Sequence, residues 1–519
     1  MRFFKYILAC FLVVYIVSAC HKKVTNPNHD LTIEAFSEWK TAGYAIKSHR
    51  ISAYLSRIGS MDKDTTWADY RTRAYYLSKG KFLWITRNGV DCRADSLLAF
   101  LKTVSEMGFS PRKFRAQTIE DDLTHLRSLN VDAAKYDINR LLARLEYNLT
   151  KAYLRYTAGQ RFGFMNPKRI FNRLDVYEPD SLHKSFRGLY DIPMELAGKL
   201  FFEAALRKIG NDSVAQFLHE VQPQNPLYVS LLNRLKQCST QTERIKMLCN
   251  MERCRWRLYD YPWRHRKYVL VNIPSFHLRA VDQDSVLEMK IGCGSLETKT
   301  PLLTSRIMRM DLNPQWVIPR SIVRKSIANH AGDSAYFASH RYYVRERKTI
   351  KRIPVSLVSR SMLNSSDYFV IQEGGEGNAL GRIIFRFNNN FSVFLHYTSA
   401  PGVFEQSSRD VSHGCVRVEK PLDLAVFLLK NKDEKIIEKI RYSMTVDLGN
   451  QRDKGQRGVE FRPPVDKSKL IGSLKVEPEV PLFITYYTLY PDRYGQLEEF
   501  PDVYGYDRVI YNYLGNYTK

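Results

Sequence analysis

The chain has 519 residues, with 79 Lys and Arg against 54 Asp and Glu, which gives a formal net charge of +25. Its 44% hydrophobic content is ordinary for a globular protein and excludes a disordered or fibrous chain, while eight cysteines exclude a disulfide-dense scaffold. The charge favours anionic partners, but no dense basic block stands out, so surface solvation explains it equally well.

The N-terminus has the anatomy of an export signal. Arg2 and Lys5 flank the start of an apolar run that ends at Ser18-Ala19-Cys20. The run is too short for a comfortable membrane-spanning helix, and no later stretch is long enough to cross a bilayer. We therefore expect residues 1–19 to be removed and residues 20–33 to form a polar tether.

Residues 17–20 resemble a bacterial lipobox, which implies that Cys20 is lipidated; the alternative is a plain secretory signal with a chance cysteine. Several acyl chains would hold the protein stably on a membrane. The expected location is therefore the cell envelope or periplasm, lipid-anchored after export. An exported protein of this kind rarely meets nucleic acid, so anionic wall polymer or lipid head groups are the expected anionic partners.

Residues 31–254 show mainly helical periodicity, without short repeats or low-complexity tracts. The segments expected to be helical are 94–107, 138–156, 193–209 and 227–235. Cys238, Cys249 and Cys254 lie near the end of this half, where buried free thiols are favoured and one disulfide stays open. No Cys/His spacing typical of a zinc site occurs, so we expect no metal.

The periodicity changes to that of strands after residue 262, and we therefore expect an α+β chain. The segments expected to be strands are 268–273, 275–280, 286–291, 382–387, 392–397, 415–418 and 480–487. A short helix is expected at 421–430, where Leu424, Phe427 and Leu428 form an apolar face. His396 would then lie at one strand end and Cys415 at the start of another.

The motif that carries chemistry is Ser412-His413-Gly414-Cys415, preceded by His396 with fifteen residues between them. A thiol becomes a good nucleophile when the fold brings a base close to it, and that base is usually a histidine. Cys415 is the predicted nucleophile and His396 the predicted base. A structural thiol and a satisfied core histidine are the alternatives.

These residues resemble the L,D-transpeptidase catalytic (YkuD) domain of peptidoglycan cross-linking enzymes. Further segments resemble the large, scaffold-bearing branch of that family: 83–84, 161–163, 268–276, 300–301, 313–319, 378–382 and 480–506. The resemblance implies a helical N-terminal scaffold domain followed by a mainly β catalytic domain with an inserted capping subdomain. The implied ranges are 34–262 for the scaffold domain, 263–450 for the catalytic domain, about 327–377 for the capping subdomain, and 451–519 for a C-terminal segment that packs back on the scaffold or catalytic domain.

The resemblance also implies roles around the nucleophile. The carbonyl of Tyr397 would orient the imidazole of His396, and the N–H groups of Gly414 and Cys415 are candidates for an oxyanion hole. His413 would line the cleft, donate a hydrogen bond or simply hold the turn.

Substrate contacts are expected from three further residues. Arg417 lies two residues after Cys415, on the same side of an extended segment, where its guanidinium would hold a substrate carboxylate. A surface ion pair with Glu405 or Glu419 is the alternative. Ser412 and Asn378 are candidate substrate-binding residues, although a turn role is favoured for both.

By the resemblance, Cys415 attacks the carbonyl between the diamino acid and the terminal D-alanine of a donor tetrapeptide stem. D-alanine leaves, a thioester forms, and the side-chain amine of an acceptor stem then gives a 3→3 cross-link. Water as the acceptor would make the protein an L,D-carboxypeptidase instead. No cofactor is needed, carbapenems would acylate the thiol, and partners among the wall-synthesis proteins are expected.

Two other classes are weaker. Sortases also place His before Cys and Arg after it but lack Ser-His-Gly-Cys, while papain-like hydrolases place Cys before His. A non-catalytic lipoprotein that organises wall enzymes is disfavoured because both His396 and Cys415 are present.

Overall fold

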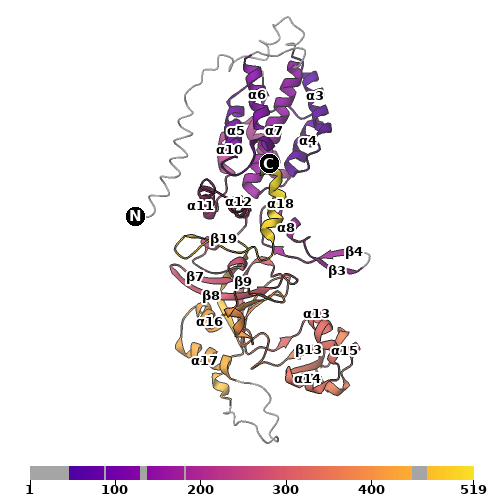
Figure 1. Ribbon diagram of the computed structural model, residues 1–519, viewed down its shortest axis with the longest axis vertical. Coiled ribbons are helices and arrows are strands. Elements are labelled where there is room, and N and C mark those ends of the chain that lie inside the picture. Colours follow the sequence, from indigo (N-terminus) through magenta and orange to yellow (C-terminus); the bar gives the residue numbers. More distant parts are fainter. Residues whose placement is uncertain (1–45, 87–88, 129–136, 181–182, 447–464, 519) are drawn as a thin grey trace. The chain divides into compact units, whose positions relative to one another are not determined.

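The computed structural model describes residues 46–86, 89–128, 137–180, 183–446 and 465–518 (Figure 1). The predicted signal, the tether and Cys20 lie outside these residues. The chain divides into two compact units, the first comprising Met1–Phe164, Leu196–Arg257 and Tyr511–Lys519, and the second Met165–Glu195 and Leu258–Ile510. A helical first unit and a mainly β second unit confirm the expected α+β class.

The first unit is a helical assembly around one long central helix, α7 (Ile138–Phe162). Its other helices are α3 (Ser48–Met61), α4 (Trp67–Leu77), α5 (Cys92–Thr103), α6 (Ala116–Arg127), α9 (Lys199–Gly210), α10 (Val214–Glu220), α11 (Pro226–Leu235), α12 (Gln241–Arg255) and the end of α18 (Tyr506–Thr518). A short hairpin, β1 (Ile85–Thr86) and β2 (Gly89–Val90), precedes α5. The helices expected at 94–107, 138–156 and 227–235 are all present.

Helix α7 is buried along nearly its whole length, and several of its buried polar side chains are hydrogen-bonded. The Asp137 side chain caps its first turn, and Gly163 ends it with φ 91°. The buried Glu146 carboxylate accepts backbone N–H groups from Leu83, Trp84 and Ile85 at 2.5–3.1 Å. The segment at 83–85 is thereby fixed to the centre of the unit.

The second unit is built on a ten-stranded sheet. Its neighbouring strands are, in order, β14 (Ile383–Phe387), β15 (Leu395–His396), β17 (Val416–Val418), β8 (Ser285–Gly294), β7 (His277–Asp282), β6 (Lys267–Asn272), β18 (Ser473–Thr485), β9 (Leu302–Leu312) and β5 (Tyr190–Asp191), with β16 (Asp410–Ser412) against β8. Strand β14 also pairs with β9, so eight of these strands close into a ring. The closed ring encloses a core that includes Val269, Ile291, Ile307, Phe385, Leu395 and Val416.

An inserted subdomain follows β9. Its sheet has the order β10 (Trp316–Val317), β13 (Tyr368–Gln372), β11 (Tyr342–Glu346) and β12 (Arg352–Ile353), and α13 (Arg320–Ile322), α14 (Ser334–Ser339) and α15 (Arg360–Asn364) surround it (Figure 1). A separate hydrophobic core, from Ile318 to Val370, fills this subdomain. It begins about ten residues before the expected 327 because β10 pairs with β13 and closes the insertion at its base.

The domain ranges expected from sequence differ from the two units at residues 165–195. This segment falls inside the predicted 34–262, but β5 pairs with β9 in the sheet of the second unit. It also contains α8 (Pro167–Phe171) and the hairpin of β3 (Val176–Asp180) and β4 (His183–Phe186). The helix expected at 193–209 begins only at Lys199, after this segment has ended. Backbone pairing with a distant strand is invisible to local periodicity, which explains the difference.

The C-terminal segment supplies central structure. Strand β18 lies between β6 and β9, parallel to the first and antiparallel to the second. The small hairpin β19 (Leu489–Pro491) and β20 (Leu497–Glu499) follows it, and Tyr511–Lys519 belongs to the first unit. Residues 451–464 of the predicted segment are outside the described part.

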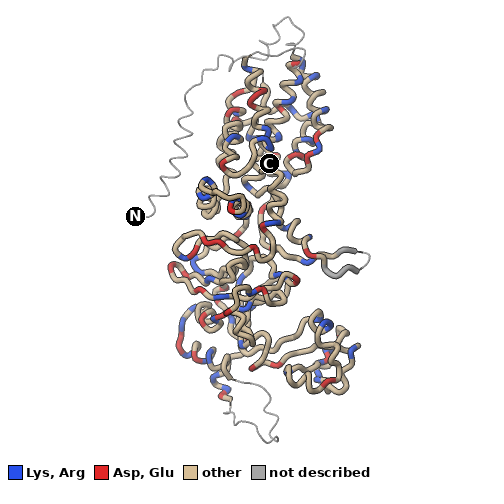
Figure 2. The backbone as a smooth tube through the Cα atoms, in the orientation of Figure 1, with Lys and Arg blue, Asp and Glu red and all other residues tan. Residues whose placement is uncertain are grey.

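Lys and Arg alternate with Asp and Glu along both units (Figure 2). In the described ranges no helix is long and apolar enough to cross a membrane, and no group of three or more His, Cys, Asp or Glu side chains has the geometry of a metal site. Within the described residues Cys238, Cys249 and Cys254 form no disulfide, and the last two are buried.

Candidate active site

The structure brings His396 and Cys415 together through two parallel strands. In the β15–β17 pair Leu395 lies opposite Val416 and His396 opposite Arg417, and Val416 N–H donates to the Phe394 carbonyl at 3.0 Å. Both strands belong to the closed ring, so their register is fixed by neighbours on each side. Histidine and thiol, 19 residues apart in sequence, are therefore brought close together, with His396 on β15 and Cys415 directly before the neighbouring β17.

The turn before Cys415 is held by the side chain of Ser412. The Ser412 hydroxyl donates to the Cys415 carbonyl at 2.6 Å and accepts the Gly414 N–H at 3.1 Å. Ser412 is 4% exposed, and its own carbonyl accepts Ser295 N–H and the Thr298 hydroxyl. The hydrogen-bonding groups of Ser412 hold the turn, the role that the sequence favours, and a substrate contact at Ser412 stays a prediction.

This geometry also bears on the prediction that the N–H groups of Gly414 and Cys415 form an oxyanion hole. The Gly414 N–H is engaged by Ser412 Oγ and does not point freely into a site. Gly414 itself has φ +115°, a conformation that favours glycine, and it provides the sharp turn. Among the described residues no acceptor is found for the Cys415 N–H, which leaves this donor available.

His396 is buried, with 4% of its surface exposed, and its Nδ1 has no hydrogen-bond partner among the described residues. Burial, and after it the positive charge of Arg417, lower the pKa of His396 to about 4, while the backbone of Tyr397 and Leu380 acts in the opposite direction. The imidazole is therefore neutral at pH 7. A backbone interaction of Tyr397 with the imidazole was predicted from the sequence, whereas the interaction of the Leu380 backbone was not.

Cys415 is mostly buried, and burial raises the pKa of its thiol. A backbone hydrogen bond from Phe394 and the Arg417 charge lower that pKa, but less than burial raises it. Thiol and imidazole are thus both neutral in the free protein. Proton transfer from sulfur must then accompany attack on a substrate, rather than precede it.

Arg417 provides positive charge beside both groups. Its Nε is buried and has no hydrogen-bond partner in the described ranges. The ion pairs considered as alternatives do not form there: Glu405 pairs with Lys290 at 3.6 Å, and the Glu419 carboxylate accepts the Lys290 N–H at 2.9 Å. A guanidinium with an unused, buried donor is suited to an anionic ligand.

His413 is exposed at the outer side of the turn. Burial, Arg417 and Lys325 lower its pKa in that order, so it is also surrounded by positive charge. Lys325 belongs to the inserted subdomain, in the turn at Val323–Ile327 that follows α13. Part of the insertion therefore lies close enough to the Cys415 turn to act on it electrostatically.

Asn378 has a structural role. It is 1% exposed; its side-chain amide donates to the carbonyls of Pro314 and Glu373, and its side-chain oxygen accepts the Leu380 N–H. These hydrogen bonds hold the turn at Asn378, and a substrate contact at this residue stays a prediction. The turn leads into Gly381, which lies against the strand end that carries His396.

Several residues that support the site were not assigned a role from sequence. An added Cβ at Gly381, where φ is +66°, would lie 2.7 Å from the Tyr397 Cβ and the Thr398 nitrogen. Thr300 Oγ1 donates to the Gly414 carbonyl at 2.9 Å and accepts the Gly294 N–H at 2.9 Å. In the sequence, only the family resemblance of segments 300–301 and 378–382 indicated Thr300 and Gly381. The fold shows which residues Thr300 and Gly381 contact.

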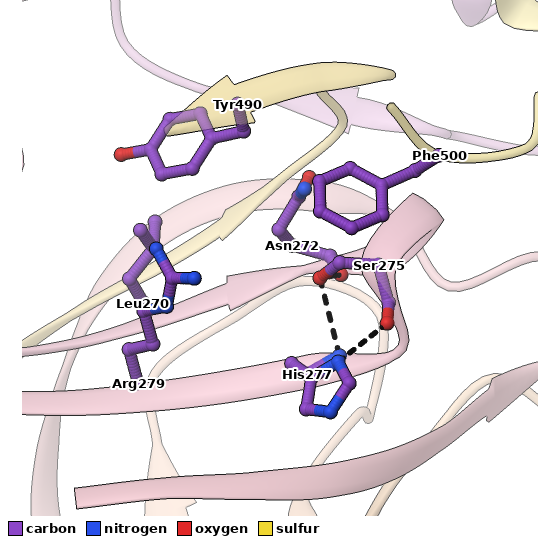
Figure 3. A pocket seen from close by; sticks show the side chains of 7 residues that line it. All are labelled: Leu270, Asn272, Ser275, His277, Arg279, Tyr490 and Phe500. Atoms are coloured by element: carbon purple, nitrogen blue, oxygen red, sulfur yellow. Dashed lines mark hydrogen bonds between the residues drawn. The ribbon is translucent and has the colours of Figure 1, made fainter. Parts of the chain in front are cut away.

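A small pocket lies elsewhere in the second unit, over the β6–β7 hairpin and beside β19 and β20 (Figure 3). Its lining residues are Leu270, Asn272, Ser275, His277, Arg279, Tyr490 and Phe500. Figure 3 shows His277 turned toward Ser275, whose carbonyl lies 2.6 Å from His277 Nδ1. None of the candidate site residues lines this pocket, and we assign it no part in the chemistry at Cys415.

Comparison with known proteins agrees with this geometry. Residues 266–438 match the L,D-transpeptidase catalytic domain, and residues 70–235 match a scaffold domain. The chain is 27% identical over 307 residues to a Haemophilus influenzae protein described as "Putative L,D-transpeptidase". That match covers 59% of this chain and 58% of the length of the relative. The chain therefore carries the catalytic domain of the L,D-transpeptidase family, preceded by a scaffold domain.

Proposed function

We propose that this protein is a peptidoglycan L,D-transpeptidase that forms 3→3 cross-links through a thioester on Cys415. The observation that carries the proposal is the parallel β15–β17 pair, which aligns a buried base, a thiol and a guanidinium on one edge of the ring. The family of the catalytic domain gives the reaction class.

In the first step His396 Nδ1 accepts the thiol proton as Cys415 sulfur attacks the carbonyl before the terminal D-alanine of a donor stem. Nδ1 is suited to this because it is buried and holds no other hydrogen bond in the described ranges. The Cys415 N–H is the available donor for the developing oxyanion. The carbon–nitrogen bond breaks, D-alanine takes the proton from the imidazolium, and a thioester remains.

In the second step the side-chain amine of an acceptor stem attacks the thioester carbonyl and loses its proton to His396. The new amide bond forms as the carbon–sulfur bond breaks, and the thiol is restored. Water in place of the amine gives trimming of the stem, the L,D-carboxypeptidase outcome. The groups that this cycle takes from the protein are the Cys415 thiol and N–H and the His396 imidazole.

Arg417 is proposed to hold the free carboxylate of the donor diamino acid. Its buried, unused Nε and its position two residues after the nucleophile support this role. The inserted subdomain adds charge of the same sign: residues 316–372 hold ten Lys or Arg and three Asp or Glu. We propose that this subdomain gates the entry of anionic stems to the cleft.

The cellular context is proposed from the sequence. Export and lipidation at Cys20 would place the enzyme in the cell envelope, beside its polymeric substrate, with a membrane and wall-synthesis proteins as partners. Nucleic acid has no place in this proposal.

The test is intact-mass spectrometry of the purified protein after incubation with a disaccharide-tetrapeptide or with a carbapenem. One acyl adduct on Cys415, release of D-alanine and 3→3 dimers among the muropeptides are expected. Tripeptides without dimers would establish the carboxypeptidase. A folded protein that gains no adduct from either reagent would contradict the proposal and favour a non-catalytic scaffold.

A further inference from the structure

A buried network of neutral groups connects the C-terminal segment to the turn that carries Cys415. The Tyr504 hydroxyl donates to the Gly294 carbonyl at 2.6 Å and accepts the Thr300 N–H at 3.1 Å. Thr300 Oγ1 in turn accepts the Gly294 N–H and donates to the Gly414 carbonyl, both at 2.9 Å. Two hydroxyls thus join Gly294, at the end of β8, to the residue directly before the nucleophile.

The packing around this network leaves little freedom. A Cβ at Gly294 would lie 2.1 Å from the Thr298 carbonyl oxygen, 2.7 Å from the Thr300 nitrogen and 3.0 Å from the Gly414 Cα. Thr300 is fully buried and Tyr504 is 6% exposed. A displacement of Gly294 or Thr300 must therefore move Gly414 and, through it, the backbone of Cys415.

Tyr504 is itself fixed from the other side. Its N–H donates to the Tyr486 hydroxyl at 2.7 Å, and that hydroxyl donates to Asp502 at 2.7 Å. The two tyrosine rings lie 5.8 Å apart and nearly parallel. Tyr486 directly follows β18, a central strand of the ring, so Tyr504 is anchored to the ring rather than to a surface loop.

The hydroxyl of Tyr504 keeps its proton under all working conditions. Burial raises the pKa of Tyr504 well above its usual value, and the neighbouring Cys293 acts in the same direction. Burial likewise raises the pKa of Cys293 to about 12, so this neighbour stays an uncharged thiol. Tyr504 can therefore donate and accept at once, and its role is geometric rather than electrostatic.

We propose that Tyr504 and Thr300 are positioning residues for Cys415: their hydroxyls hold the Gly294–Gly414 contact and thereby orient the turn that presents the thiol to His396. The inference rests on the proposed function for its activity assay. It assigns a catalytic consequence to the C-terminal segment, which lies about ninety residues after the nucleophile in sequence.

The test compares Tyr504→Phe with Tyr506→Phe. Both changes delete one buried hydroxyl, and the Tyr506 hydroxyl has no hydrogen-bond partner in the described part of the chain, which makes Tyr506→Phe the matched control. For carbapenem acylation, Tyr504→Phe should lower the first-order acylation constant per folded molecule by roughly 10- to 100-fold, with the reversible binding constant unchanged. Tyr506→Phe should behave as wild type.

Thr300 gives an independent check. Thr300→Val removes the hydroxyl at nearly constant volume and should reproduce the Tyr504→Phe defect, while Thr300→Ser keeps both hydrogen bonds and should restore most of the rate. A purely structural role predicts less folded protein but an unchanged acylation constant in every variant, and that result would overturn the inference.

Site-resolved alkylation of Cys415 by iodoacetamide separates this inference from the proposed function. If wild type is not acylated, yet Tyr504→Phe and Thr300→Val still change the rate and pH profile of Cys415 alkylation, the positioning role stands and the transpeptidase proposal fails. If wild type is acylated and all four variants match it, the proposal stands and the positioning role fails.

Discussion

His396 on β15 lies directly opposite Arg417 on β17, in a parallel pair inside a closed ring of strands. A parallel register fixes the residues that face each other, so the guanidinium that lowers the pKa of the imidazole also lies beside the thiol. Burial is the main cause of the pKa shift of both groups, and Arg417 adds a positive charge beside each of them.

The identity of the nucleophile is tested by Cys415→Ala. The change should lower acylation by a carbapenem and D-alanine release by at least about 10³-fold, because it removes the thiol that forms the proposed thioester. Cys92→Ser is the control, since Cys92 is an exposed cysteine of the helical unit. An adduct that persists on Cys415→Ala, located by peptide mass mapping, would assign the chemistry to another residue.

The buried His396 predicts a pH dependence of stability. Its pKa is about 4 in the folded protein and about 6.5 in an unfolded chain, so the unfolded state binds more protons between these values. The stabilisation is present above pH 6.5 and is lost as pH falls toward 4, at a cost of about 3 kcal/mol. Denaturant titrations measure the free energy of unfolding at pH 7 and pH 4. Between these two pH values, His396→Gln should lose about 3 kcal/mol less of this free energy than wild type.

The same shift gives the pH dependence of the reaction. Because His396 is neutral above pH 4, it can accept the thiol proton through the neutral range. Acylation should therefore show no loss between pH 7 and pH 5 from protonation of this base. A rate that falls with a midpoint near 6.5 would mean that His396 titrates as an exposed histidine.

Arg417 is expected to act on both binding and the thiol. Arg417→Lys keeps the charge but loses the planar pair of donors, so kcat/KM for a tetrapeptide should fall by roughly 10- to 100-fold, mainly through KM. Arg417→Ala also removes the charge that lowers the pKa of Cys415, and its alkylation profile should move to higher pH. Equal kinetics for Arg417→Lys and wild type would exclude bidentate recognition of a carboxylate.

Gly381 tests the support of the histidine strand. Gly381→Ala would place a Cβ 2.7 Å from Tyr397, next to His396, whereas a Cβ at Gly377 would meet nothing within 4 Å. Both glycines have positive φ, +66° and +75°, so both changes should cost about 1–3 kcal/mol of stability. Only Gly381→Ala should also slow acylation per folded molecule; an equal effect of the two variants would remove this role.

The gating role of the inserted subdomain is tested by excision. Trp316 and Gln372 face each other in an antiparallel pair, so a short Gly-Ser turn can join them after the residues between are deleted. The subdomain has its own hydrophobic core, and its loss should leave the ring folded. Acylation by a tetrapeptide should change by about tenfold or more; an unchanged rate in the folded deletion variant would contradict the gate.

Local patterns were sufficient to predict the α+β class, most strand segments near the site, and the residues whose chemistry is distinctive. A cysteine in a Ser-His-Gly-Cys turn with an upstream histidine at a strand end is readable because side-chain alternation and turn residues are local properties. The same patterns predicted that Arg417 faces the same side of its strand as Cys415. They favoured a turn role for Ser412 and Asn378, but they could not predict which backbone groups the two side chains would bind.

Only the tertiary structure decided which strands pair and which distant side chains come into contact. The placement of β5 in the catalytic sheet, the β15–β17 register and the contact of Tyr504 with Gly294 each join residues far apart in sequence. Backbone hydrogen bonds and burial of this kind depend on which strands become neighbours when the ring closes. The sequence by itself determined which groups can react, and the closure of the ring determined which of them meet, how they are charged and what holds them in place.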